Sequence, residues 1–150
     1  MPARATAIDG KALAEARQER LRERVAALAA VGRRPCLAAV TVVDEPGWRV
    51  YQGGQRKRCE ALGVQYRPVA LPAGAAQADL LECIESLNAE AEVHGVIIQA
   101  PLPAPFDLFQ AQSLLAPSRD VEGVNPANLG LLMAGRGGIV PCTARSAVAL

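Results

Sequence analysis

Helical spacing of apolar residues alternates along this chain with short runs that are continuously apolar. Residues 11–30 repeat apolar side chains at helical spacing, and Asp9 stands where its carboxylate can cap the first free amides of a helix. The run 36–43, with the sequence CLAAVTVV, is apolar throughout, which is typical of a buried strand in a parallel sheet. The chain is therefore predicted to begin with a helix followed by a buried strand.

The same alternation continues toward the C-terminal part of the sequence. A turn at 44–47 precedes a helix predicted over 48–62, and Gly63 occupies the position that favours glycine after a helix. Residues 64–71 are predicted as a strand, in which Pro68 has no N–H for pairing, so we expect an edge position or a bulge. The remaining predicted elements are a helix over 76–91, a strand over 96–99, a short helix over 107–115 and a short helix that ends at Met133.

Strands separated by helices predict an α/β domain. We expect three layers, with a mainly parallel sheet, right-handed crossovers and helices on both faces. In such sheets ligands bind beyond the carboxyl ends of the strands, which are here the loops after Val43, Leu71 and Gln99. Periodicity alone thus predicts a ligand cleft at this edge but leaves its chemistry unspecified.

Length and charge narrow the class of protein further. A chain of 150 residues has room for about one ordinary domain. Sixteen basic against fifteen acidic residues give a net charge of +1, which argues against a nucleic-acid-coating or polybasic membrane protein. No apolar stretch is long enough for a membrane helix and the N-terminus lacks a signal core, so we expect a cytoplasmic location.

The cysteines and the single histidine do not form a recognisable metal site. The cysteines are widely spaced and include no C-x-x-C pair, so we interpret them as reduced core or near-core residues: Cys36, Cys59, Cys83 and Cys142. Cys142 attracts most interest because it lies in a predicted Pro-Cys-Thr turn. His94, which precedes a glycine at the start of a strand, is interpreted as structural.

Four segments, in matching order and spacing, resemble the bifunctional methylenetetrahydrofolate dehydrogenase / methenyltetrahydrofolate cyclohydrolase family. They are IDGKALA (8–14), VVDEPGWRVYQGGQRKRCEALGV (42–64), GVIIQAPLPAP (95–105) and SRDVEGVNPANLGLLMAGRGGIVPCT (118–143). The resemblance implies that residues 1–140 form the folate-binding catalytic domain of that family. Residues 141–150 would begin the connection to the family's NADP-binding Rossmann domain, which we expect to be absent from this chain.

The resemblance implies NADP as the cofactor, but we expect no NADP site within this chain. Its only glycine cluster, at 135–138, does not follow a predicted strand or open a βαβ unit of about 30 residues. Family members oxidise methylenetetrahydrofolate with NADP and hydrolyse the methenyl product to 10-formyltetrahydrofolate.

The family carries a tyrosine and a lysine four residues apart on one helix, which places both side chains on one face. Tyr51 matches the tyrosine, but Gln55 stands where the lysine belongs. The chain has no other lysines than Lys11 and Lys57, and Lys57 lies about 240° around the helix from Tyr51. Because losing a positioned acid–base group costs about 10²- to 10⁴-fold in rate, we expect impaired cyclohydrolase activity. The predicted catalytic residues are Tyr51, Gln55 and Gln99.

Other matched positions are implied to contact the folate. Trp48 replaces a small serine, so it either plugs the substrate cleft or lies at the surface. Glu122 replaces the second aspartate of Asp-Val-Asp-Gly and is predicted to contact the pterin, while Asp120 can equally serve as a loop or helix cap. Ala144 replaces a proline. The predicted substrate-binding residues are Trp48, Pro101, Leu102, Asp120 and Glu122.

Three functional hypotheses stay open at this point. The first is the folate-binding half of a one-carbon enzyme, with a homodimer or a separate NADP-binding domain as partner and no nucleic acid or membrane. The second is a non-catalytic module that binds reduced folate or a protein partner. The third is the substrate domain of an amino-acid dehydrogenase, which the spacing of Tyr51, Gln99 and the segment 120–123 makes improbable.

Overall fold

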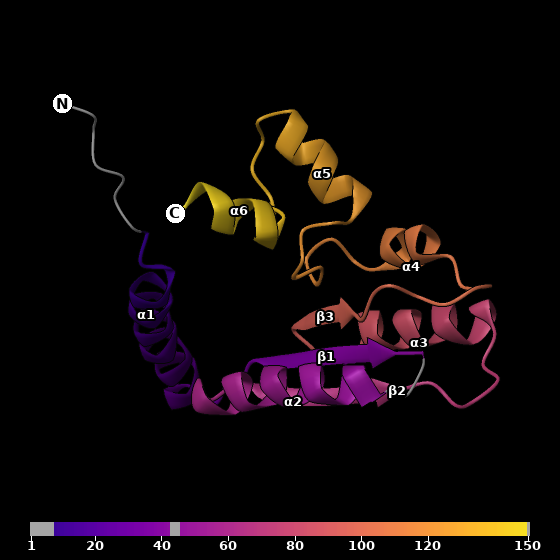
Figure 1. The fold of residues 1–150 in the computed structure, drawn as a ribbon, viewed down its shortest axis with the longest axis horizontal. Helices are drawn as coiled ribbons and strands as arrows, with labels where there is room; N and C mark the ends of the chain where they lie inside the picture. The colour runs from indigo at the N-terminus through magenta and orange to yellow at the C-terminus, as the bar shows by residue number, and fades with distance from the viewer. Residues whose placement is uncertain (1–7, 43–45, 150) are drawn as a thin grey trace.

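The computed structural model describes residues 8–42 and 46–149. These residues form the following elements (Figure 1): α1 (Gly10–Ala30), β1 (Cys36–Thr41), α2 (Pro46–Ala61), β2 (Gln65–Ala70), α3 (Gln77–Ala89), β3 (Gly95–Ile98), α4 (Leu108–Leu114), α5 (Pro126–Met133) and α6 (Cys142–Val148). None of the helices in the described residues is long and apolar enough to span a membrane.

The three strands form one parallel sheet in the order β2-β1-β3, as the alternating pattern predicts. Pro68 pairs with Ala39 on edge strand β2, where its missing N–H faces away from the sheet's interior. The register between β1 and β2 runs unbroken from Cys36–Gln65 to Thr41–Ala70. The predicted edge position is therefore confirmed, without a bulge.

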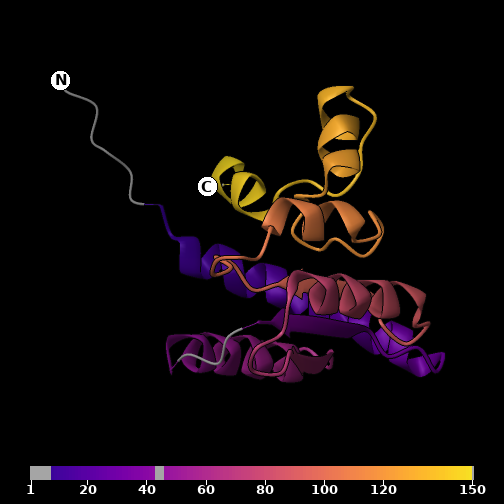
Figure 2. The same ribbon diagram turned by 90° about the vertical axis from the view of Figure 1, so that its right-hand side faces the viewer.

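Helices cover both faces of this sheet, so the predicted three-layer α/β architecture is confirmed. Figure 2 shows α2 on one side of the strands and α3 on the other, with α4 beside α3. The core lies between the sheet and the α3/α4 layer, and most of its apolar side chains have almost no exposed surface. Its buried members are Ala38, Val40, Leu80, Ile84, Leu87, Val93, Val96, Ile98, Ala111 and Leu115.

Helix α1 begins where the sequence predicts and packs only lightly on the rest of the domain. Asp9 accepts a hydrogen bond from the backbone N–H of Ala12 at 2.9 Å, which confirms the predicted cap. Of its 21 residues only Val25 is buried, next to Gly63, whose positive φ of 77° ends α2 as predicted. Most of the surface of α1 thus remains open.

Several predicted boundaries shift by a few residues. Strand β1 ends at Thr41, two residues before the predicted end at Val43, which lies outside the described residues. Helix α2 begins at Pro46, inside the segment predicted as a turn. Proline is tolerated in the first turn of a helix because its missing N–H needs no partner there. The rest of the predicted turn, 44–45, lies outside the described residues.

The prediction of a Pro-Cys-Thr turn is wrong, because Cys142 begins helix α6. The backbone N–H of Cys142 donates to the carbonyl of Glu122 at 3.1 Å, and the hydroxyl of Ser146 donates back to the carbonyl of Cys142 at 2.8 Å. Pro141 supplies a φ of −49° that leads into the helix. The long-range bond to Glu122 is invisible in the local sequence, which explains the error.

The predicted core placement of the cysteines holds for Cys36, which is buried, and approximately for Cys59 and Cys83, which are half-buried. It is wrong for Cys142, which is exposed at the start of α6. Burial raises the pKa of the Cys36, Cys59 and Cys83 thiols. His94 accepts a hydrogen bond from the backbone N–H of Cys36 at 3.2 Å, in agreement with the predicted structural role.

Candidate substrate site

Three polar side chains meet where α2 lies against the sheet, and we call them the Gln55 cluster: Gln55, Tyr66 and Gln99. Gln99 follows β3 at the carboxyl edge of the sheet, whereas Tyr66 is the second residue of β2. The side-chain oxygen of Gln55 on α2 accepts a hydrogen bond from the Gln99 amide at 2.8 Å. The same oxygen accepts a second hydrogen bond from the Tyr66 hydroxyl at 3.1 Å. The fold thus joins a helix, an edge strand and the residue that follows β3.

Sheet geometry explains why these side chains converge. Gln99 extends β3, since its backbone N–H donates to the carbonyl of Val40 on β1 at 2.9 Å. Its side chain is buried with 4% of its surface exposed, so it needs a polar partner, which Gln55 supplies. One turn earlier on α2, the amide of Gln52 donates to the hydroxyl of Thr41 at the end of β1, at 2.6 Å. These two contacts fix α2 against the strand ends.

The hydrogen bonds determine what Gln55 can do chemically. Its carboxamide oxygen carries two bonds, which uses both of its lone pairs. Within 8–42 and 46–149 its NH₂ group has no recorded partner and is the part left to meet a ligand. An amide NH₂ donates hydrogen bonds and has no useful basicity near neutral pH. Gln55 is therefore suited to hold an acceptor group of a ligand and unsuited to take a proton from water.

Tyr66 is a member of the cluster that the sequence interpretation missed. Burial raises the pKa of its phenol, and the nearby Arg56 guanidinium, 5.8 Å from the centre of the ring, opposes that shift. The phenol thus stays a protonated donor toward Gln55 at neutral pH. A tyrosine on a predicted edge strand was the available signal, but only its hydrogen bond to Gln55 shows that it faces α2.

Tyr51 lies near this cluster without joining its hydrogen bonds. Its side chain is 54% exposed, and its hydroxyl makes no hydrogen bond to any described residue. Its ring meets Trp48 edge to face, with the ring centres 6.3 Å apart and the planes at 82°. Trp48 itself is half-buried. The catalytic role of Tyr51 and the substrate contact of Trp48 stay predictions.

Asp120 organises the loop between α4 and α5. Its carboxylate is 1% exposed and accepts hydrogen bonds from the backbone N–H of Gly123 at 2.9 Å and of Asn125 at 2.8 Å. The side-chain amide of Asn128 donates a third bond at 2.9 Å. Both carboxylate oxygens are thus engaged, which matches the loop-capping alternative. Its predicted substrate contact stays a prediction.

The remaining predicted substrate-binding residues are partly open. Glu122 is half-buried, and burial raises the pKa of its carboxyl, helped by the neighbouring charge of Asp120. Pro101 is exposed, while Leu102 packs against the apolar core and so has a structural contact of its own. Their contacts with folate stay predictions.

The described part of the chain offers little for a metal or a dinucleotide. Among the described residues no group of three or more His, Cys, Asp or Glu side chains could hold a metal ion. Gly135, Gly137 and Gly138 follow helix α5 rather than a strand and adopt positive φ angles. A dinucleotide-binding loop needs a strand before the glycines and a helix N-terminus behind them. The glycine segment therefore does not fit NADP.

A parallel sheet covered by helices on both faces places this chain in the α/β class, in which small-molecule sites are common near the carboxyl ends of the strands. The family model described as the tetrahydrofolate dehydrogenase/cyclohydrolase catalytic domain matches residues 8–122. The chain belongs to this family. The third hypothesis, an amino-acid dehydrogenase domain, is thereby excluded.

Named relatives agree with this assignment. The chain is 37% identical over all of its length to "Bifunctional protein FolD 1" of a Nocardioides species, of which it covers 51%. It is 41% identical over 136 residues to "Bifunctional protein FolD" of Bordetella avium, with 91% of this chain and 48% of the relative covered. The chain thus spans about half the length of the relatives that it matches.

Solved structures show the same arrangement of elements. The Campylobacter jejuni FolD methylenetetrahydrofolate dehydrogenase/cyclohydrolase superposes with a TM-score of 0.86 at 35% identity, covering 90% of this chain and 48% of that protein. The Trypanosoma brucei enzyme, solved with NADP cofactor and inhibitor, gives a TM-score of 0.87 at 36% identity, with 99% and 51% covered. The chain is therefore similar in fold to one half of these enzymes.

Proposed function

We propose that this chain binds a reduced folate at the Gln55 cluster and has little or no cyclohydrolase activity. The observation that carries the proposal is the double hydrogen bond that Gln55 accepts from Tyr66 and Gln99. These bonds hold a neutral amide at the helix position where the family resemblance places a lysine. The pterin of a folate offers carbonyl and ring-nitrogen acceptors, which the free NH₂ group of Gln55 can meet.

Hydrolysis of a methenyl folate requires a water molecule to add to the cationic carbon and to lose a proton. A general base must accept that proton for the reaction to be fast. Gln55 can position the water through a hydrogen bond but cannot take its proton. Glu122 is the candidate carboxylate of the predicted site, and burial raises its pKa, which makes it a better proton acceptor than an exposed glutamate. Slow residual hydrolysis would then pass through Glu122.

Hydride transfer to NADP is the family's other reaction. When bound, NADP would accept a hydride from the folate methylene carbon. Because the glycine segment of this chain does not fit a dinucleotide, oxidation would depend on an NADP-binding domain outside the described residues. That domain, the homodimer and the cytoplasmic location remain predictions.

A non-catalytic folate-binding module is the second candidate function. Two observations favour it: the oxygen of Gln55 is fully occupied, and Trp48 lies edge-on against Tyr51 beside the cluster. The two candidates agree on folate binding and differ in turnover.

Thermal unfolding with tetrahydrofolate tests the shared part of the proposal. A ligand that binds only the native state stabilises it by about 2.7 kcal/mol at 100 times its Kd. We expect a dose-dependent rise in Tm for the wild-type chain and a smaller rise for Gln55→Ala. Gln110→Ala, a glutamine on α4 outside the cluster, is the matched control and should behave like the wild type. No rise at millimolar tetrahydrofolate would contradict folate binding.

A further inference from the structure

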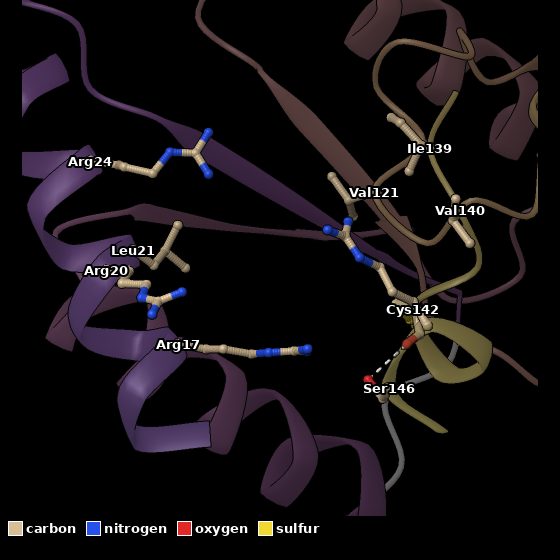
Figure 3. Close-up of a pocket in the computed structure, with 10 residues that line it drawn as sticks. Arg17, Arg20, Leu21, Arg24, Val121, Ile139, Val140, Cys142 and Ser146 are labelled. Carbon is tan, nitrogen blue, oxygen red and sulfur yellow. Dashed lines mark hydrogen bonds between the residues drawn. The ribbon is translucent and has the colours of Figure 1, made fainter. Parts of the chain in front are cut away.

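A second cavity lies between α1 and α6, away from the Gln55 cluster. Its volume is about 610 Å³, which falls within the range of about 300–1,000 Å³ typical of ligand pockets. Arginines line it from two helices: Arg17, Arg20 and Arg24 on α1, and Arg145 on α6. Figure 3 shows the three α1 side chains extending from the helix into the space that faces Cys142.

None of these arginines has a side-chain partner within the described residues 8–42 and 46–149. Two other arginines are paired with acidic side chains, since Arg22 contacts Glu19 and Arg67 contacts Glu90. The lining of the cavity contains no acidic residue. In a chain with a net charge of only +1, this is a local concentration of uncompensated positive charge.

The wall opposite α1 is held in place by close backbone packing. Gly123 has a φ of 73°, and a Cβ atom there would lie 2.5 Å from the carbonyl carbon of Val140. The backbone hydrogen bond from Cys142 to Glu122 ties the same two segments together. Val121 and Val140, which line the cavity, therefore belong to a fixed surface.

The lining of the cavity also includes apolar side chains on both sides. Leu21 on α1 and Val121 on the opposite wall are each 40% exposed, so part of their apolar surface faces the open space. An occupant with an apolar body and anionic groups would contact these apolar side chains and the arginines together.

A second copy of the chain is a poor occupant. The Arg17, Arg20 and Arg24 positions share one face of α1, and a symmetric pairing through this cavity would bring the same cations together. Like charges brought together in this way destabilise an interface. The charge of the cavity thus requires an anionic occupant.

We propose that the cavity between α1 and α6 binds a small organic polyanion, a molecule with at least two phosphate or carboxylate groups on an apolar body. Guanidinium groups bind both kinds of anion through paired N–H donors, and four of them can hold several anionic groups at once. This site is separate from the proposed folate site and does not depend on it.

Isothermal titration of the intact chain at low salt tests the proposal with three probes. Tripolyphosphate represents phosphates, and citrate represents carboxylates. Benzene-1,3,5-tricarboxylate carries as many carboxylates as citrate on an apolar ring. We expect binding of at least one phosphate or carboxylate probe and tighter binding of the aromatic tricarboxylate than of citrate. Raising the salt concentration should weaken all of these interactions, since salt screens exposed charges.

Paired variants locate the binding. Arg20→Gln with Arg24→Gln should weaken the binding of the probes by about tenfold or more, because each substitution removes a charged hydrogen-bond donor. The control, Arg33→Gln with Arg136→Gln, removes the same charge outside the cavity. Its affinity for the probes should stay within about twofold of the wild-type value. Thermal unfolding of each variant checks that the fold is intact.

Several results would overturn the proposal. Equal weakening by both pairs of substitutions would show non-specific attraction to positive charge. No detectable binding of any probe at 10 mM, an order-of-magnitude ceiling for a specific site, would show that the cavity holds no polyanion. Binding of an oligoglutamate peptide, with none of the three probes bound, would assign the surface to an acidic polypeptide instead.

Discussion

The loop around Asp120 and the Gln55 cluster were both predicted to contact the same substrate, but their hydrogen bonding differs in the structure. The carboxylate of Asp120 is fully enclosed, and three N–H donors occupy its two oxygens. In the Gln55 cluster, the oxygen of Gln55 is occupied while its NH₂ group has no recorded partner among the described residues. The carboxylate oxygens of Asp120 are therefore bonded within the protein, whereas the NH₂ group of Gln55 is available to a ligand.

The difference shows how a motif position can be judged from its hydrogen bonds. A buried carboxylate that satisfies three donors cannot exchange them for a ligand without leaving N–H groups unpaired. A half-buried amide with open N–H groups can bind a ligand without that cost. Asp120 is thus expected to matter for stability and Gln55 for substrate chemistry.

The largest expected effect on stability belongs to Asp120→Asn. The asparagine presents an NH₂ group toward donors that the carboxylate now accepts, so at least one buried N–H loses its partner. We expect the free energy of unfolding to fall by about 3 kcal/mol, measured by urea denaturation. Asp107→Asn is the matched control, because Asp107 caps α4 at an exposed position and asparagine caps equally well. A loss below about 1 kcal/mol for Asp120→Asn would contradict the architectural role.

A smaller effect is expected for Tyr66→Phe, which removes one of the two donors to Gln55. The free energy of unfolding should fall by about 1 kcal/mol, the usual net worth of one hydrogen bond. The released Gln55 side chain should also bind tetrahydrofolate more weakly. Tyr51→Phe removes a hydroxyl with no hydrogen bond to the described residues and should change stability by less than about 0.5 kcal/mol. Equal losses in the free energy of unfolding for the two substitutions would contradict the proposal that only the Tyr66 hydroxyl is held in a hydrogen bond.

The smallest expected effect is the contribution of Glu122 to the pH dependence of the free energy of unfolding. Its pKa is raised by burial above the ordinary 4.5, so the folded state binds this proton more tightly than the unfolded state. The stability that this group contributes is present at low pH and is lost as pH rises from about 4.5 through the raised pKa. Urea unfolding of wild type and Glu122→Gln between pH 4 and 7.5 should show the wild type losing stability relative to the variant. A constant difference across this range would contradict the raised pKa.

Most of the fold could be predicted from the sequence because its signals are local. The cap at Asp9, the glycine that ends α2 and the apolar strand at 36–41 each depend on neighbouring residues. Helix α6 was missed because a hydrogen bond from a distant segment, at Glu122, fixes its first residue. Local periodicity contains no trace of that contact.

The candidate site was only partly predictable for the same reason. Spacing on one helix placed Tyr51 and Gln55 together, and the family resemblance added Gln99. Tyr66 comes from an edge strand and reaches Gln55 only through the register of β2 against β1. Its contribution depends on a tertiary contact, so no pattern within residues 64–71 could reveal it.

The most direct test of the central claim is the hydrolysis rate of methenyltetrahydrofolate, followed by absorbance, for wild type and Gln55→Lys. A lysine at this position could contact Tyr66 and Gln99 while restoring a group that exchanges protons. The account predicts a wild-type rate near the uncatalysed background and a gain of about 10²- to 10⁴-fold for the variant, the usual contribution of a positioned acid–base group. A wild-type rate far above background, unchanged by Gln55→Lys, would contradict it.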